Sequence, residues 1–163
     1  MDRERMLDMD KRIRPLRLAT LGVLGLFLLI ATPWLGGKTI FTAIIAVIVA
    51  GGFFAVAAAL TGRSSRPEYT LFTGWAASEV VIAACIIVTG GANSPALAWL
   101  AIPVVTLTAR FSTRGVILGV LVTELLLLIS VASSGWSDFL DNPLTVGAVS
   151  VLIVCVAILS SAL

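Results

Sequence analysis

The sequence predicts an all-α membrane protein with six transmembrane helices and both termini in the cytosol. Three observations support this prediction: the composition, a series of long apolar runs, and the placement of the basic residues. Hydrophobic residues make up 59% of the 163 positions and charged residues only 12%, which is far too apolar for a soluble domain of this size. No basic patch is interleaved with aromatic residues, so the expected partner is the lipid bilayer and not a nucleic acid.

The apolar runs are each close to the roughly 20 residues that cross the hydrocarbon core of a bilayer. A charged leader of mixed sign, residues 1–15, precedes them, and residues 16–163 are expected to form one membrane domain with short connectors. The predicted spans are 16–35, 39–61, 70–90, 95–110, 115–133 and 144–163. Pro103 lies inside the fourth span. It is expected to kink this span, because proline has no backbone N–H to donate to the Trp99 carbonyl.

The orientation follows from the 11 Lys and Arg residues. If the N-terminus is cytosolic, all of them except Lys38 fall on the cytosolic side, which is the bias that the positive-inside rule describes. The turn near residue 90 and the loop around residue 136 then face outward. Trp34, Trp99 and Trp136 fall near the outer interface, where amphipathic rings are favoured. The prediction is a multi-pass plasma-membrane protein.

A short polar turn, residues 89–95, separates the third and fourth spans. Gly90 and Gly91 permit positive φ at little steric cost, which ends the preceding helix. Asn93 or Ser94 can cap the next helix, and Pro95 suits its first turn. The turn displays polar groups where two helices meet. It is either a ligand site or only an economical hairpin, because turn chemistry alone accounts for every residue.

Glu79 and Glu124 are acidic residues in the middle of the third and fifth spans. Each lies about 13–14 Å from the predicted start of its span, and no Lys or Arg lies at that depth. An ionised carboxylate there costs about 2.5–3.5 kcal/mol. Each is therefore expected to be protonated, hydrogen-bonded to Ser, Thr or a free carbonyl, or engaged with a ligand. Either both carboxyls line one cavity with Pro103 and the glycine turn, or they are neutral groups that hold helices together.

Catalytic and metal chemistry are not expected in this chain. It has no histidine, which excludes a phosphoacceptor histidine, a histidine-bearing metal site and a Ser-His-Asp triad. Cys85 and Cys155 lie inside the third and sixth spans and are interpreted as small apolar packing residues. Small residues recur at four-residue spacing, as is typical of close contacts between membrane helices. These patterns are Gly51-xxx-Ala55-xxx-Ala59, Gly74-xxx-Ser78 and Gly115-xxx-Gly119-xxx-Thr123.

Residues 90–95, 99–105 and 109–115 together resemble the six-span N-terminal membrane region of bacterial diguanylate cyclase (GGDEF) signalling proteins. A related pattern, Gly-Gly-x-x-Asn-Pro-Phe, occurs in quinone-responsive sensor histidine kinases. Of that pattern this chain has Gly90, Gly91 and Pro95, whereas Ser94 and Ala96 replace the Asn and the Phe.

The resemblance implies an inner-membrane sensory or anchoring module. It would form a homodimer, respond to an unidentified small-molecule cue, and control a cytosolic diguanylate cyclase following residue 163. Quinone is the only cofactor that the related pattern would imply. The candidate ligand-binding residues are Glu79, Gly90, Gly91, Asn93, Ser94, Pro95, Trp99, Pro103 and Glu124. The alternatives are the membrane region of a sensor histidine kinase or class III nucleotide cyclase, and a small proton- or cation-coupled transporter that uses the midplane acids.

Overall fold

The structure is a computed structural model, and it describes residues 37–63, 67–108, 111–133, 135–141 and 143–161, with a few isolated positions between 15 and 30. Apart from those isolated positions, the predicted leader 1–15 and first span 16–35 lie outside the described residues. Every element in the described ranges is a helix. This confirms that the described part of the chain is all-α.

Four long helices follow the predicted apolar runs closely, because each run is bounded by Gly, Pro or polar residues. They are α2 (Gly37–Arg63), α3 (Pro67–Val88), α5 (Thr113–Ser133) and α7 (Pro143–Ser161). Within the described residues, three helical stretches are long and apolar enough to cross a membrane: Tyr69–Val88, Thr113–Ser133 and Pro143–Ser161. These correspond to the third, fifth and sixth predicted spans.

The fourth predicted span, 95–110, differs from the structure. A short 3₁₀ helix, η2 (Leu97–Leu100), leads into a short α-helix, α4 (Ala101–Thr108). The resulting apolar helix over Leu97–Thr108 is shorter than the three candidate spans. Pro103 lies in the first turn of α4, directly after η2. The change of helix type occurs ahead of the proline, between η2 and α4. The kink at Pro103 stays a prediction.

The range 134–143, predicted as a plain connector, contains a further short helix. Gly135 has a φ of +114° just after α5, a conformation that L side chains rarely adopt. Helix α6 (Trp136–Asp141) follows directly. Six residues are too few to reveal a helical period in the sequence, so this helix was missed.

The chain divides into two compact units, Met1–Ala77 and Ser78–Leu163, with the boundary inside α3. In the first unit, α2 and α3 approach closely at Gly74. A Cβ added to Gly74 would lie 3.2 Å from the Cβ of Ala57. The small-residue pattern correctly predicted a contact at Gly74. On α2, however, the contact falls on Ala57, whereas Ala55 and Ala59 are exposed.

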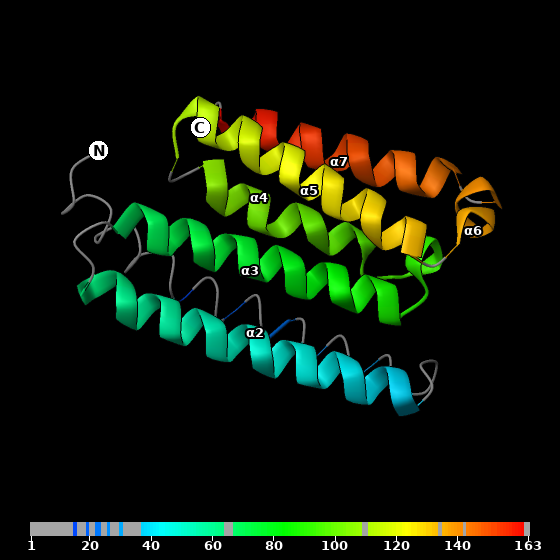
Figure 1. The fold of residues 1–163 in the computed structure, drawn as a ribbon, viewed down its shortest axis with the longest axis horizontal. Helices are drawn as coiled ribbons and strands as arrows, with labels where there is room; N and C mark the ends of the chain where they lie inside the picture. Colours follow the sequence, from blue (N-terminus) through cyan, green and yellow to red (C-terminus); the bar gives the residue numbers. More distant parts are fainter. Residues whose placement is uncertain are drawn as a thin grey trace. The chain divides into compact units, whose positions relative to one another are not determined.

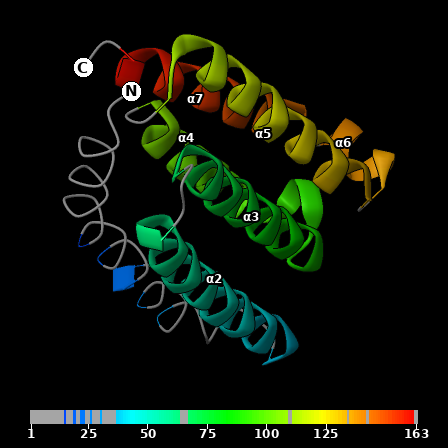
Figure 2. The same cartoon turned by 60° about the vertical axis from the view of Figure 1, so that its left-hand side comes forward.

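In the second unit, α4, α5 and α7 pack against one another, as Figures 1 and 2 show from two directions. Helix α6 lies at one end of α5 and α7 and also contacts η1 (Gly91–Asn93). Both α5 and α7 bury one side. The buried residues of α7 recur at intervals of three and four: Val146, Val149, Ile153 and Ala157.

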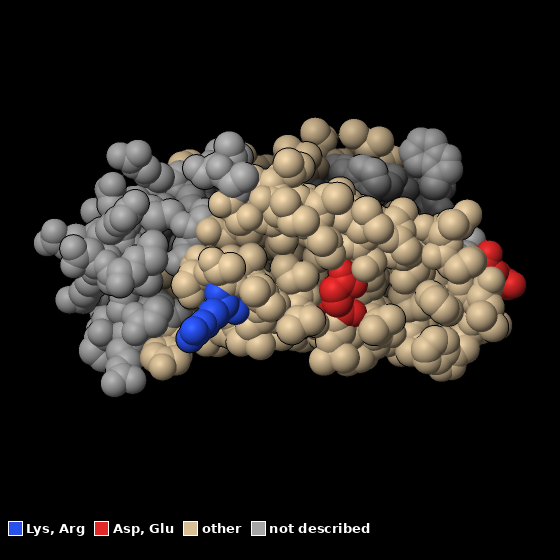
Figure 3. All heavy atoms as spheres, turned by 90° about the horizontal axis from the view of Figure 1, so that it is seen from above, with Lys and Arg blue, Asp and Glu red and all other residues tan. Residues whose placement is uncertain are grey.

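The other sides of these helices expose large aliphatic residues, including Leu121 and Leu125 of α5 and Val151 and Ile158 of α7. Figure 3 shows a broad face of the molecule that carries few charged groups. A soluble protein rarely exposes so large an apolar surface, whereas the hydrocarbon core of a bilayer requires one.

Candidate functional site

The glycine turn takes the form that its residues predict. Helix α3 ends at Val88, and Gly90 and Gly91 follow with φ of +113° and +56°. The chain then forms the short 3₁₀ helix η1, which ends at Asn93. The positive φ values explain why glycine occupies both positions, since a Cβ would be strained there.

Ser94 is the buried polar group of this turn, with 4% of its surface exposed. Its Oγ accepts the backbone N–H of Ala96 at 3.1 Å and lies within hydrogen-bonding distance of the Thr89 hydroxyl. Thr89 in turn donates to the Cys85 carbonyl at 2.6 Å. Ser94 therefore fixes the turn to the end of α3. It does not cap the next helix, because η2 begins only after Pro95 and Ala96.

The other turn residues differ in exposure. Asn93 and Pro95 are exposed. Trp99 is partly buried and packs against the apolar core of the second unit. Pro103 is buried in α4. The polar contacts of Ser94 stabilise the turn itself.

Glu79 is fully buried in α3, with 0% exposure. The Thr123 hydroxyl of α5 donates to its Oε1 at 3.1 Å, which confirms that Glu79 bonds a Ser or Thr side chain. Within the part of the chain that the structure describes, Oε2 of Glu79 has no hydrogen-bond partner. A buried oxygen without a partner is costly, so this carboxyl has the unused capacity for one more hydrogen bond.

Thr123 also contacts its own helix, because its Oγ1 lies 3.1 Å from the Gly119 carbonyl. A hydroxyl has one hydrogen and can donate to only one of these two oxygens at a time. The Thr123 hydroxyl therefore lies between two acceptors, Oε1 of Glu79 on α3 and the Gly119 carbonyl on its own helix.

Glu124, the next residue on α5, has a different partner. Its Oε2 accepts the Ser150 hydroxyl of α7 at 2.9 Å. Its Oε1 is buried and, among the described residues, has no hydrogen-bond partner. The Glu124 side chain as a whole is partly exposed.

Consecutive residues of an α-helix point about 100° apart. Thr123 and Glu124 can therefore face two different neighbours, and α5 joins α3 on one side and α7 on the other. Ser130 adds a second polar contact to α3, since its hydroxyl donates to Leu126 at 2.7 Å and lies 3.4 Å from the Ala83 carbonyl. The middle of α5 thus connects both neighbouring helices through polar side chains.

The carboxyl contacts and the glycine turn lie at different positions along α3. Glu79 and Thr89 lie ten residues apart on α3 and its C-terminal end, which corresponds to about 15 Å along the helix axis. The two groups of polar contacts therefore lie at different heights along α3. The prediction that Glu79, Glu124, Pro103 and the glycine turn line one cavity stays a prediction.

Three hydroxyl residues of these sites were not among the predicted ligand residues: Thr89, Thr123 and Ser150. Thr123 had been assigned only to the packing face of the fifth span. A sequence signal was available for two of them, because Thr123 and Ser150 are polar residues inside long apolar runs. Polar side chains in membrane spans commonly bond across helices.

Comparisons with protein-family models, with curated proteins and with solved structures gave no match to this chain. The two sites are therefore interpreted from their own residues.

Proposed function

We propose that this chain is the membrane-embedded sensory or anchoring module of a bacterial signalling protein. In this proposal it crosses the inner membrane six times, has both termini in the cytosol and forms a homodimer. Its output is a cytosolic diguanylate cyclase that joins two GTP molecules into cyclic di-GMP when two catalytic domains meet. No residue of this chain performs that chemistry.

The observation that carries the proposal is the polar connection through α5. Thr123 contacts Glu79 of α3, and the neighbouring Glu124 accepts a bond from Ser150 of α7. A cue that changes the α3 contact would alter the position of α5 and hence of α7. A ligand can shift a conformational equilibrium only through such differential contacts.

The experiment uses the gene that contains this chain. The sequence after the codon for Leu163 is read first, and a Gly-Gly-Asp/Glu-Glu-Phe signature is the expected result. Cyclic di-GMP formation from GTP is then measured in membranes that contain the full-length protein. Thr123→Val and Ser150→Ala should each change the rate. Cys155→Ser is the matched control, because Cys155 is exposed and lies outside these contacts.

Other results would lead to different conclusions. A dimerisation helix bearing a histidine after residue 163 would replace the cyclase with a histidine kinase, and a class III catalytic domain would replace it with another nucleotide cyclase. If the two variants retain the wild-type rate, the membrane region is an anchor that does not communicate through α5.

A second candidate function is proton- or cation-coupled transport. It is favoured by Glu79 and Glu124, each of which has one buried carboxyl oxygen without a partner among the described residues. Ionisable groups at this depth commonly mark ion pathways. In proteoliposomes, a solute-dependent proton flux that disappears in Glu79→Gln would support transport, and a flux unchanged by the substitution would exclude this role for Glu79.

A further inference from the structure

Helix α6 (Trp136–Asp141) connects two helices that are each long enough to cross a membrane, α5 and α7. Residues 134 and 135 connect it to Ser133 at the end of α5, and residue 142 connects it to Pro143 at the start of α7. If α5 and α7 cross the bilayer, a helix between their adjacent ends must lie at the boundary of the hydrocarbon core. The connectivity thus fixes the depth of α6.

The side chains of α6 divide into an apolar and a polar row. Trp136 and Leu140, four residues apart and hence on one face, are 62% and 71% exposed. Ser137 and Asp141, also four residues apart, are exposed as well. Phe139 packs against the core of the second unit and meets the Trp136 ring edge-on, with centroids 5.7 Å apart. This contact fixes the direction of the Trp136 ring.

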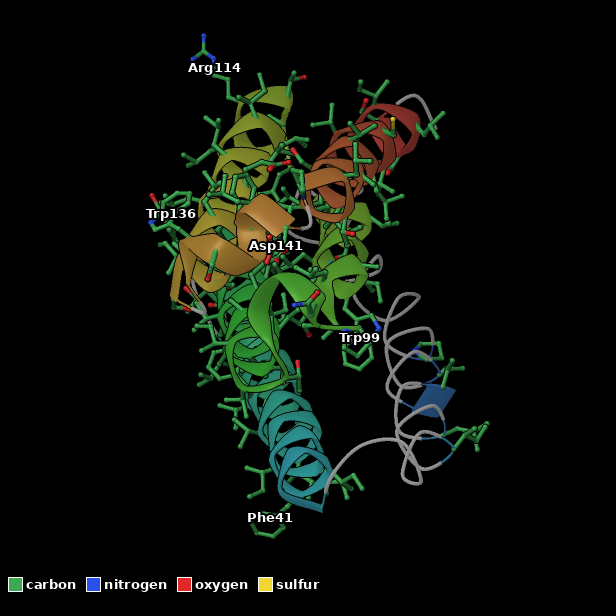
Figure 4. All side chains as sticks on the ribbon, turned by 90° about the vertical axis from the view of Figure 1, so that its right-hand side faces the viewer. Phe41, Trp99, Arg114, Trp136 and Asp141 are labelled. Carbon is green, nitrogen blue, oxygen red and sulfur yellow. The ribbon has the colours of Figure 1, made fainter. Side chains whose placement is uncertain are left out.

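Trp136 and Asp141 point in different directions, as a membrane boundary requires. In Figure 4, which views the molecule from its α6 end, Trp136 projects sideways from the helices, whereas Asp141 lies over the end that faces the viewer. Leu144, at the start of the next helix α7, is 87% exposed. A lateral apolar row beside a terminal polar row is the arrangement of an interfacial helix.

The charged residues around α6 indicate which lipid headgroups this helix can bind. From residue 115 to residue 163 the sequence contains no Lys or Arg, and Asp138 and Asp141 are the acidic residues of α6. Binding of a helix to anionic headgroups depends on basic residues, which this segment does not supply. Zwitterionic headgroups impose no such requirement.

We propose that α6 is an interfacial helix that docks on the boundary between headgroups and acyl chains of a zwitterionic bilayer. Trp136, Leu140 and Leu144 enter the lipid, and Ser137 and Asp141 face water. The indole ring of Trp136 supplies an apolar body and a polar N–H at the depth where tryptophan is favoured. This surface is independent of the signalling role, because it requires only that α5 and α7 cross the membrane.

Site-directed spin labelling of the full chain tests the proposal. Leu140→Cys and the matched control Ser137→Cys are each prepared with Cys155→Ser, labelled with a nitroxide and reconstituted in phosphatidylethanolamine-rich vesicles. Collision rates with oxygen, which concentrates in lipid, and with a water-soluble nickel chelate are measured. The ratio of oxygen to nickel collisions should be several-fold higher at position 140 than at position 137. A label at Leu121, in the exposed middle of α5, should give the highest ratio.

Equal ratios with free access of the nickel chelate to both α6 positions would overturn the proposal and place α6 in water. Low access of both reagents to position 140 would also overturn it, because a protein surface, such as a second copy of the chain, would then cover the apolar row. A water-exposed label at Leu121 would remove the premise that α5 crosses the membrane.

A second measurement does not depend on new cysteines. Lipids brominated in their acyl chains should quench the fluorescence of the wild-type protein more than that of Trp136→Phe. Replacing part of the zwitterionic lipid by phosphatidylglycerol should not increase this difference. No loss of quenching in Trp136→Phe would overturn the docking, and stronger quenching in anionic vesicles would overturn the headgroup assignment.

Discussion

Glu79 and Glu124 look equivalent in the sequence but differ in the structure. Both are acidic residues in the middle of apolar helices, and each accepts one hydroxyl bond. Glu79, however, has 0% exposure, whereas Glu124 is partly exposed between α5 and α7. Two carboxyls in the middle of their helices can therefore differ in burial. The neighbouring helix that covers each carboxyl determines how much of it is exposed.

Thr123, the partner of Glu79, lies four residues after Gly119 on the buried side of α5, and α5 packs against α4. Disrupting this packing should cause the largest loss of stability. A Cβ at Gly119 would lie 2.1 Å from Cδ2 of the fully buried Leu107. Gly119→Val should therefore destabilise the protein by about 1–3 kcal/mol, the usual cost of overpacking. The measurement is SDS-induced unfolding in mixed micelles, followed by circular dichroism.

Gly147→Val is the matched control for that substitution. Gly147 also lies inside a helix, α7, but a Cβ there would meet no atom within 4 Å. The same change of residue should leave stability nearly unaltered. Equal losses in the two variants would indicate that helix propensity, and not the contact with Leu107, controls the effect.

Hydropathy could predict the helices of this fold but not their buried faces. Residue after residue in α5 is apolar, so hydropathy shows no stripe that would identify a core side. The four-residue spacing of Gly119 and Thr123 did identify the packing face, and both residues are buried. It did so because small side chains are what permits close approach of two helices.

The fourth span and α6 show what apolar runs cannot reveal. Hydropathy counts residues 95–110 as one run, but Pro95 precedes the helix, which in the described residues covers Leu97–Thr108. Conversely, α6 (Trp136–Asp141) is only six residues long, which is too short for a helical pattern to be recognised in the sequence. The polar partners were equally hidden, because the sequence places Ser150 far from Glu124 and only the packing of α5 on α7 brings them together.

Removing the hydroxyl partner of Glu79 should destabilise the protein more than removing the partner of Glu124. Hydrogen bonds between membrane helices contribute about 0.6 kcal/mol on average and at most about 1.7 kcal/mol. Thr123→Val should approach the upper value, because it leaves Oε1 of the fully buried Glu79 without its partner. Ser150→Ala should lie near the average, since Glu124 is partly exposed. The same unfolding assay measures both variants. A larger loss of stability in Ser150→Ala than in Thr123→Val would contradict this prediction.

Replacing each carboxyl by an amide should have a smaller effect. Glutamine preserves the length of the side chain and an oxygen that can accept the Thr123 or Ser150 hydroxyl, and it is never ionised. Glu79→Gln and Glu124→Gln should therefore each change stability by less than about 0.6 kcal/mol, the average for one hydrogen bond between membrane helices. A much larger loss in Glu79→Gln alone would mean that the buried contact requires a carboxyl and that the amide cannot replace it.

The smallest expected effect is the coupling between the two contacts. Glu79 and Ser150 share no hydrogen-bond partner in the structure, because one bonds Thr123 and the other bonds Glu124. Thr123 and Glu124 are nevertheless adjacent on α5, so the losses in Glu79→Gln and Ser150→Ala should deviate from additivity in the double variant by slightly more than the roughly 0.3–0.5 kcal/mol seen for independent sites. Strictly additive losses would contradict the transmission from α3 to α7 on which the signalling proposal depends.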